Sequence, residues 1–209
     1  LGFGQLHAVE QNLVLLTGLD IDVQAGNLRI YPDEKLRADV RNSIVRQFGE
    51  DDKEVIGIHI SARKISQRWE ASNFVALIRQ MHARRDCRFV LFWSPGSAND
   101  PKHPGDDDKA AKIMAAVSGI PLLPMATQTL PALIAGLASV DRMICSDGGA
   151  MHLAAALGKP IVCLFGDSDA KVWHPWGVPY RILQPASRDV CEVLPEDVLK
   201  AFDDLECPL

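Results

Sequence analysis

The run from Ser146 to Gly166 holds the residue types that bind an anion through the protein backbone. A glycine pair, Gly148 and Gly149, leads into a stretch of small residues that lies between two apolar runs. Glycine lets the backbone approach a ligand closely, and the start of a helix offers unpaired N–H groups and the positive end of its dipole. The pattern therefore predicts an anion site, most often for a phosphate.

Two polar side chains accompany the glycine pair. Asp147 is interpreted either as a carboxylate that faces a ligand or as the N-cap of the following helix, and the cap is the more economical explanation. His152, one turn into that helix, could donate to a phosphate or a sugar hydroxyl, although a single helical histidine is usually structural.

A basic loop from Ser61 to Trp69 is the second feature with chemical potential. Its three cations, Arg63, Lys64 and Arg68, fall within six residues and could neutralise a diphosphate that the acidic chain as a whole would repel. A solvated basic loop is the alternative. The position directly after an apolar strand favours the binding interpretation, while we expect Trp69 to pack at a helix entry.

The sequence does not favour a metal site, a dinucleotide or phosphate loop, or a serine nucleophile. The acidic runs at 106–108 and 167–169 resemble ligands for a hard cation, but such triplets are more often caps or solvated turns, so we predict no metal site. No glycine-rich dinucleotide fingerprint follows a strand, and the Gly-Lys-Pro sequence at 158–160 is not a phosphate loop. A Gly-x-Ser-x-Gly nucleophile elbow is also missing.

Apolar runs and helical periodicity alternate from residue 55 onward. We expect strands over 55–60, 88–93, 122–123, 142–145, 161–165 and 180–183, and helices over 72–84, 106–117, 130–138, 150–157 and 195–205. This alternation predicts an α/β fold: a doubly wound, mostly parallel sheet with helices on both faces. Right-handed crossovers then place ligands at the carboxyl ends of the strands.

The first 50 residues have a different pattern. Helical spacing predicts a helix over 6–18 and a second that starts within 32–35 and runs to 48, with Leu36, Val40, Ile44 and Phe48 on one face. The charged turn at 49–53 is the best candidate for a domain boundary. We therefore expect residues 1–50 to form a helical connection and residues 51–209 to form the α/β domain.

Composition narrows the class of protein. The 209 residues are 47% hydrophobic and 23% charged, as in a globular protein, and the net charge of −5 gives no electrostatic footprint for nucleic acid. No apolar run approaches the roughly 20 residues that span a bilayer, and no signal peptide is visible. Five cysteines without a C-x-x-C pair favour the reducing cytoplasm. Because Leu1 is not a methionine, we expect a piece of a longer protein.

Together these motifs resemble the C-terminal half of glycosyltransferase family 9, the ADP-heptose:lipopolysaccharide heptosyltransferases. The strongest match is 146–166, with its Asp, Gly and His followed by a small-residue helix, Gly-x-Pro, an apolar strand and a Gly-Asp-Ser turn. The second match is 58–69, which ends in the basic-Trp pair at 68 and 69. The Trp-Ser-Pro-Gly sequence at 93–96 is a weaker third, and His7-x-x-Glu10-x-Asn12 resembles the family's connection out of its first lobe. The resemblance covers nearly the whole chain.

This resemblance implies the GT-B architecture of two facing Rossmann-like lobes, of which the C-terminal lobe binds the nucleotide sugar. The acceptor site and the catalytic base would lie in the N-terminal lobe, so no catalytic residue is expected in this chain. The donor-binding residues carried over are Ser61, Arg63, Lys64, Arg68, Asp107, Met125, Asp147, Gly148, Gly149 and His152.

The resemblance also implies which part of the donor each of these residues would contact. Lys64 and Arg68 would contact the diphosphate together with the backbone at 148 and 149, and the Asp147 and His152 side chains would orient the sugar or phosphate. Asp107 would hold the ribose hydroxyls. Met125, in a loop at 125–127, would contact the base.

The expected enzyme transfers a heptose or related sugar, with ADP-heptose as donor, to a lipopolysaccharide-core acceptor without a metal ion. It would be cytoplasmic, at most peripherally associated with the inner membrane. This chain alone would transfer little or no sugar. Many members have a hydroxyl residue where Gly148 stands and a lysine where Gln67 stands, which weakens the assignment of the donor. A non-catalytic nucleotide-binding or regulatory module with the same fold is the alternative.

Overall fold

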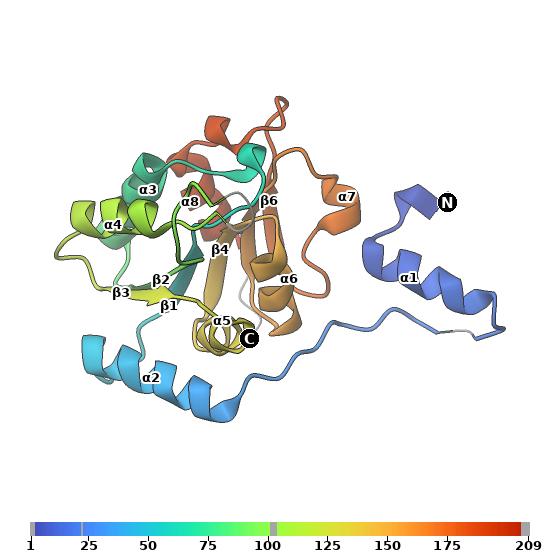
Figure 1. Cartoon of the computed structure of the whole chain (residues 1–209), viewed down its shortest axis with the longest axis horizontal. Helices are drawn as coiled ribbons and strands as arrows, with labels where there is room; N and C mark the ends of the chain where they lie inside the picture. Colours follow the sequence, from blue (N-terminus) through green and yellow to red (C-terminus); the bar gives the residue numbers. More distant parts are fainter. Residues whose placement is uncertain (1–2, 22, 101–103, 206–209) are drawn as a thin grey trace.

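The structure of the protein, a computed structural model, describes residues 3–21, 23–100 and 104–205 (Figure 1). One six-stranded sheet forms the centre of this described part. Its strands are β1 (Val55–His59), β2 (Arg88–Trp93), β3 (Leu122–Ala126), β4 (Arg142–Ser146), β5 (Ile161–Leu164) and β6 (Tyr180–Leu183). All neighbouring strands are parallel, in the order β3-β2-β1-β4-β5-β6. The predicted doubly wound parallel sheet is confirmed.

Strand β3 is longer than its sequence pattern predicts. The apolar signal covers only 122–123, because Pro124 interrupts it, yet the strand pairs with β2 along its whole length from Leu122 to Ala126. A proline is tolerated here because β3 is at the edge of the sheet, where one side of the strand has no hydrogen-bonding neighbour.

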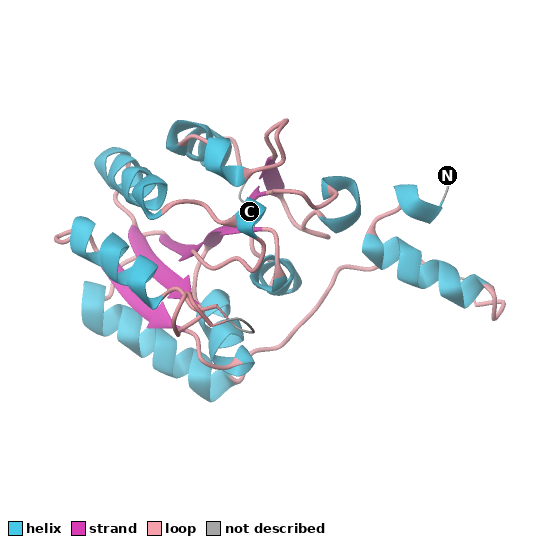
Figure 2. Ribbon diagram, turned by 45° about the horizontal axis from the view of Figure 1, so that its top comes forward, coloured by secondary structure: helices cyan, strands magenta, loops and turns pink. Residues whose placement is uncertain are grey.

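Helices cover both faces of the sheet (Figure 2). The helices are α1 (Ala8–Thr17), α2 (Glu34–Phe48), α3 (Ala71–Arg84), α4 (Asp107–Ala116), α5 (Leu130–Ala138), α6 (Gly149–Ala156), α7 (Ala170–Trp173) and α8 (Pro195–Asp203), with short 3-10 turns η1 (Phe3–Gln5), η2 (Ile65–Gln67) and η3 (Val190–Glu192). One buried core lies under α3, α4 and α8, and the other under α5 and α6. The sequence pattern indicates neither α7 nor the 3-10 turns, which are too short to show a period.

Helix α2 packs on the outside of α5, and Ile44 reaches the second core (Figure 1). The division of the chain at residue 50 stays a prediction. Buried free thiols occupy neighbouring positions on β4 and β5, at Cys145 and Cys163, in the apolar role that their sequence context predicts. Leu1 and Cys207 lie outside the described residues. Within the described part, no helix is both long enough and apolar enough to span a bilayer.

His7, just before α1, links the first helix to the domain. The His7 ring accepts a hydrogen bond from the Val9 N–H group, and the Glu10 carboxylate accepts one from the His7 N–H group, so the two residues make a capping box at the start of α1. The buried His7 ring also stacks on Trp176, with ring centroids 4.5 Å apart, and its Nε2 atom lies 2.9 Å from the His174 carbonyl oxygen. The His7-x-x-Glu10 pattern thus has a structural role in this chain.

A buried ion pair joins the two central strands at their amino ends. Arg142, at the start of β4, forms a bidentate pair with Glu54 beside β1 and donates to the Phe202 carbonyl oxygen at 3.1 Å. Its guanidinium also lies over the Phe202 ring, 3.8 Å from the centroid. Because Arg142 is only 7% exposed, these contacts hold the β1 and β4 register and the α8 helix together.

We expect Arg142→Met to lower the free energy of unfolding by about 3 kcal/mol, because it leaves the Phe202 carbonyl group without this donor and leaves Glu54 with only its 4.0 Å contact to Arg85. Urea denaturation followed by circular dichroism measures the loss. The matched control is Arg84→Met, at an exposed position on α3. A loss no larger than that of the control would contradict the assigned role.

Candidate functional site

A cleft of about 610 Å³ opens at the carboxyl ends of β1 and β4. These are the strands between which the chain order of the sheet reverses, so the connections leave toward opposite faces and a crevice remains. The residues that line the cleft are His59, Ser61, Ala62, Arg63, Lys64, Gln67, Ser146, Asp147, Gly148, Gly149, Ala150, Ser168 and Trp173. Both motifs singled out from the sequence therefore meet in one place.

A second cavity of about 360 Å³ adjoins the cleft and shares part of its wall. His59, Ser61 and Arg63 line both hollows, while the second is bounded further by apolar side chains such as Leu130 and Leu153. The combined site has a polar, cationic half and a more apolar half. Such a pair of compartments suits a ligand with a charged part and a flat apolar part.

Helix α6 begins at the glycine pair. Gly148 is the N-cap residue in an extended conformation, and no side chain of the described residues caps the helix there. A Cβ atom built on Gly148 or Gly149 would meet nothing within 4 Å, so the space before the helix is open. The first N–H groups of α6 thus face the cleft without a protein partner in the described chain, as an anion site requires.

The N-cap interpretation of Asp147 is wrong, because Gly148 is the N-cap residue of α6 and no side chain of the described residues caps that helix. The Asp147 Oδ2 atom accepts a hydrogen bond from Gln67 Nε2 at 2.7 Å. The same amide nitrogen donates to the Ser168 hydroxyl oxygen at 3.0 Å, and Gln67 is only 4% exposed. Gln67 therefore ties the basic loop both to the start of α6 and to the turn after β5.

Lys64 also connects the basic loop to the turn after β5. Its Nζ atom lies 2.9 Å from Asp167 Oδ1 and 3.3 Å from the Ser168 hydroxyl oxygen. This lysine lowers the pKa of the Asp167 carboxyl. Asp169, the other acid of the run, caps α7 by accepting from the Lys171 N–H group. Both carboxylates thus have partners within the fold.

The three cations of the basic loop have different environments. Arg63 is exposed, lines both hollows and makes no hydrogen bond or ion pair with any residue that the structure describes. Arg68 instead donates from Nε to the Ala62 carbonyl oxygen at 3.0 Å, which shapes the loop. Trp69 is buried, as predicted, and donates to the Val193 carbonyl oxygen. Arg63 is therefore the cation with the most freedom to bind a ligand.

The structure does not bring Asp107 and Met125 into the lining of the cleft. Asp107 accepts from Trp93 Nε1 at 2.7 Å and from the Gly96 N–H group at 2.9 Å, so it braces the loop after β2. Met125 belongs to β3 rather than to a loop, and its side chain packs toward Gly136 of α5, away from the cleft. The expected loop at 125–127 is therefore corrected at Met125, while its contact with a base stays a prediction.

His152 lies behind the helix start rather than in the wall of the cleft. Its ring is 6.1 Å from the Trp173 ring, which does line the cleft. Burial lowers the pKa of His152, and the nearby Asp147 carboxylate partly opposes that effect.

His59 is a site residue that the sequence reasoning missed. It is the last residue of β1, is 8% exposed and lines both hollows. Burial lowers the pKa of His59 to about 4, and the charge of Lys109 acts in the same direction. The ring is therefore neutral at pH 7. Its place at the carboxyl end of a central strand was the available signal.

The sheet order, the crossovers and the cleft at the reversal define a class, the Rossmann-like doubly wound α/β proteins. The family model of glycosyltransferase family 9 (heptosyltransferase) matches residues 3–196, and the chain belongs to this family. That match includes the basic loop, the glycine pair and the turn after β5.

Similar proteins are known by sequence and by structure. Lipopolysaccharide heptosyltransferase 3 of Escherichia coli is 28% identical over an alignment 221 residues long. The alignment covers 95% of this chain and 60% of that protein. A family 9 glycosyl transferase from Veillonella parvula has a TM-score of 0.81 at 20% identity, covering 95% of this chain and 59% of that one. E. coli heptosyltransferase WaaC with ADP has a TM-score of 0.68 at 15% identity, covering 96% and 57%. The chain thus spans about 60% of the length of these proteins.

We expect Gly166→Ala to destabilise the protein by about 1–3 kcal/mol, because the new Cβ atom would clash with the Ser66 carbonyl oxygen. The clash would push η2 away from the turn after β5 and separate Gln67 from Ser168. Urea denaturation measures the effect. Gly26→Ala, whose Cβ atom would meet nothing within 4 Å, is the control, and equal midpoints for the two variants would contradict the prediction.

We expect His59 to make the protein less stable as the pH falls from 7 to 5. An unfolded histidine binds its proton near pH 6.5 and the buried His59 only near pH 4, so acid favours the unfolded chain in between. The contribution of His59 over this interval is about 2 kcal/mol.

Denaturation of the wild type and of His59→Gln at both pH values measures this contribution. The wild type should lose more stability than His59→Gln, while His82→Gln, at an exposed position on α3, should behave like the wild type. An identical pH dependence of the wild type and His59→Gln would count against a buried, neutral His59.

Proposed function

We propose that this chain is the donor-binding part of a glycosyltransferase that moves a heptose or related sugar from a nucleoside diphosphate sugar to a lipopolysaccharide-core acceptor. The observation that carries the proposal is the cleft at the β1 and β4 ends, where the open start of α6 faces Arg63. Membership of the heptosyltransferase family supports the chemistry.

The diphosphate would occupy the polar half of the site. The free N–H groups at Gly148 and Gly149 and the guanidinium of Arg63 are donors suited to phosphate oxygens. As the bond between sugar and diphosphate breaks, negative charge grows on the leaving diphosphate, and these fixed donors would stabilise it there. This part of the site needs no metal ion for that role.

The nucleoside would occupy the more apolar half. Leu130, Leu133 and Leu153 offer apolar surface for a base, and Ser61 lies between the two halves, where its hydroxyl already accepts from the Ser94 N–H group. ADP-heptose is the donor that we infer, in keeping with the ADP named for the structural relative. Asp107 and Arg68 would act indirectly, since they shape the loops that border the ligand.

The rest of the reaction would need residues beyond those of this chain. The acceptor site and the general base would come from the part of the relatives that the chain does not span, and a base must be held close to the acceptor to act. We therefore infer that the chain alone binds the donor and transfers little sugar. We also infer a cytoplasmic location, with peripheral contact to the inner membrane where the acceptor resides.

Calorimetric titration with ADP, UDP and GDP, in buffer that contains EDTA, tests the donor assignment. We expect ADP to bind and Arg63→Ala to weaken that binding about tenfold, since a charge-assisted hydrogen bond is lost. The control is Arg84→Ala. Arg84 is exposed at the end of α3 and does not line the cleft, so this variant should bind ADP like the wild type.

Two results would overturn the assignment. One is the failure of all three diphosphates to bind at millimolar concentration. The other is equal affinity of Arg63→Ala and the wild type for ADP. Binding that appears only when EDTA is replaced by magnesium would instead show that a cation takes part.

A further inference from the structure

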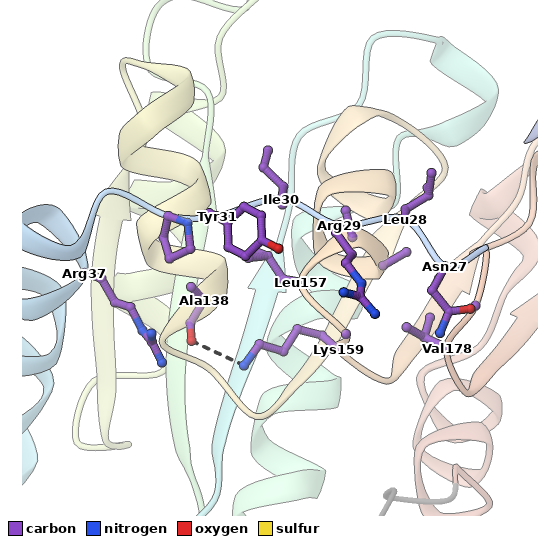
Figure 3. Close-up of a pocket in the computed structure, with 15 residues that line it drawn as sticks. Asn27, Leu28, Arg29, Ile30, Tyr31, Arg37, Ala138, Leu157, Lys159 and Val178 are labelled. Atoms are coloured by element: carbon purple, nitrogen blue, oxygen red, sulfur yellow. Dashed lines mark hydrogen bonds between the residues drawn. The ribbon is translucent and has the colours of Figure 1, made fainter.

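A second basic pocket, of about 400 Å³, lies at the opposite end of α6 from the cleft (Figure 3). The extended segment 27–32, which we call the strap, crosses the C-terminal ends of α5 and α6 here. Three cations from three elements line it: Arg29 from the strap, Arg37 from α2 and Lys159 from the turn before β5. The eight residues of α6 span about 12 Å, so the pocket and the cleft are separate.

The strap is fixed in place by hydrogen bonds to the domain. The Ile30 N–H group donates to the Ala156 carbonyl oxygen at 3.2 Å, at the end of α6. Just before the strap, the Gly26 carbonyl oxygen accepts from Trp176 Nε1 at 2.9 Å. These contacts hold an otherwise irregular segment in an extended path, so its side chains have defined directions.

An extended chain points successive side chains to opposite sides. Leu28 and Ile30 are half-buried, whereas Asn27, Arg29 and Tyr31 are exposed. Figure 3 shows the second group on the opposite side of the strap from the first, extending toward the same space as the Lys159 side chain. The alternation thus presents an amide, a guanidinium and a phenol to one side.

The contacts within the fold do not use all the donors of the three cations. Lys159 donates from Nζ to the Ala138 carbonyl oxygen at 3.3 Å, which satisfies the end of α5. Arg37 makes a 3.4 Å contact with Glu34, but its buried Nε atom has no hydrogen-bond partner among the described residues. Arg29 makes no hydrogen bond or ion pair with any described residue. Donors therefore remain for a ligand.

Positive charge is in excess around the pocket. None of the described residues that line it is acidic. Burial lowers the pKa of Lys159, and the charges of Arg37 and Arg41 act in the same direction. Asp141 is the carboxylate that opposes them, and its Oδ2 atom already accepts from the Val55 N–H group. An anion in the pocket would relieve this repulsion.

We propose that this pocket binds a phosphate monoester carried on a sugar-sized body, at a site separate from the donor cleft. Guanidinium groups match the geometry of phosphate oxygens, and here two of them face one lysine. The volume exceeds that of a bare phosphate. The Tyr31 side chain, 81% exposed at the rim, offers an aromatic face and a hydroxyl to the remainder of the ligand. The proposal does not depend on the identity of the donor.

Glucose 6-phosphate is the probe, with glucose as the uncharged comparison, and calorimetry or chemical-shift mapping on the whole chain is the measurement. We expect glucose 6-phosphate to bind and glucose not to bind. Arg29→Gln and Arg37→Gln should each weaken binding about tenfold. Arg46→Gln, further along the exposed face of α2, and Arg63→Ala, in the donor cleft, should leave it unchanged.

A vesicle-binding experiment distinguishes a phosphate carried on a lipid from one carried on a soluble molecule. Retention of the chain on phosphatidylcholine vesicles that contain phosphatidic acid, lost in Arg29→Gln, would support a lipid-borne phosphate. Binding of glucose 6-phosphate without vesicle retention would support a soluble one. The proposal is overturned if neither probe binds, if both strap and α2 variants bind like the wild type, or if Arg63→Ala abolishes the binding. Circular dichroism of each variant separates loss of the site from loss of the fold.

Discussion

The reversal of chain order between β1 and β4 is the constraint on which the site depends. Because every strand is parallel and the crossovers keep one hand, the connections after β1 and β4 turn to opposite faces of the sheet and leave a crevice between them. The basic loop and the start of α6 are the walls of that crevice. At the other end of the same two strands, the ion pair of Arg142 and Glu54 fixes their register, so one strand pair both stabilises the domain and shapes the cleft.

Most of the fold could be predicted because its elements are long or strongly apolar. The strands over Arg88–Trp93 and Tyr180–Leu183 and the helix over Leu130–Ala138 have the bounds that the pattern predicts. The failures have local causes. Pro124 interrupts the apolar pattern of the edge strand β3, whose second half is a strand because it pairs with β2. The single-turn helix α7 depends on its Asp169 cap and has no apolar period.

The site was predictable to the level of its two loops, but not to the level of its side chains. Arg63 and the glycine pair line the cleft, as their position after strands indicates. The direction of a side chain depends on partners that sequence spacing does not reveal. Trp93 at the end of β2 and the Gly96 N–H group each donate to one oxygen of Asp107, and Met125 turns toward a glycine on α5. Gln67 gave no signal as a buried connector, because its two partners lie 80 and 101 residues away.

The ion pair between Lys64 and Asp167 places a carboxylate counter-ion beside a lysine that lines the cleft. A phosphate that recruits Lys64 must take it from that carboxylate, so the exchange occurs between fixed groups of the protein and releases few bound ions from solution. Occupancy of such a site responds less steeply to ionic strength than occupancy of an open basic patch, whose bulk counter-ions are set free. A ligand phosphate that binds Lys64 would therefore take the place of the Asp167 carboxylate.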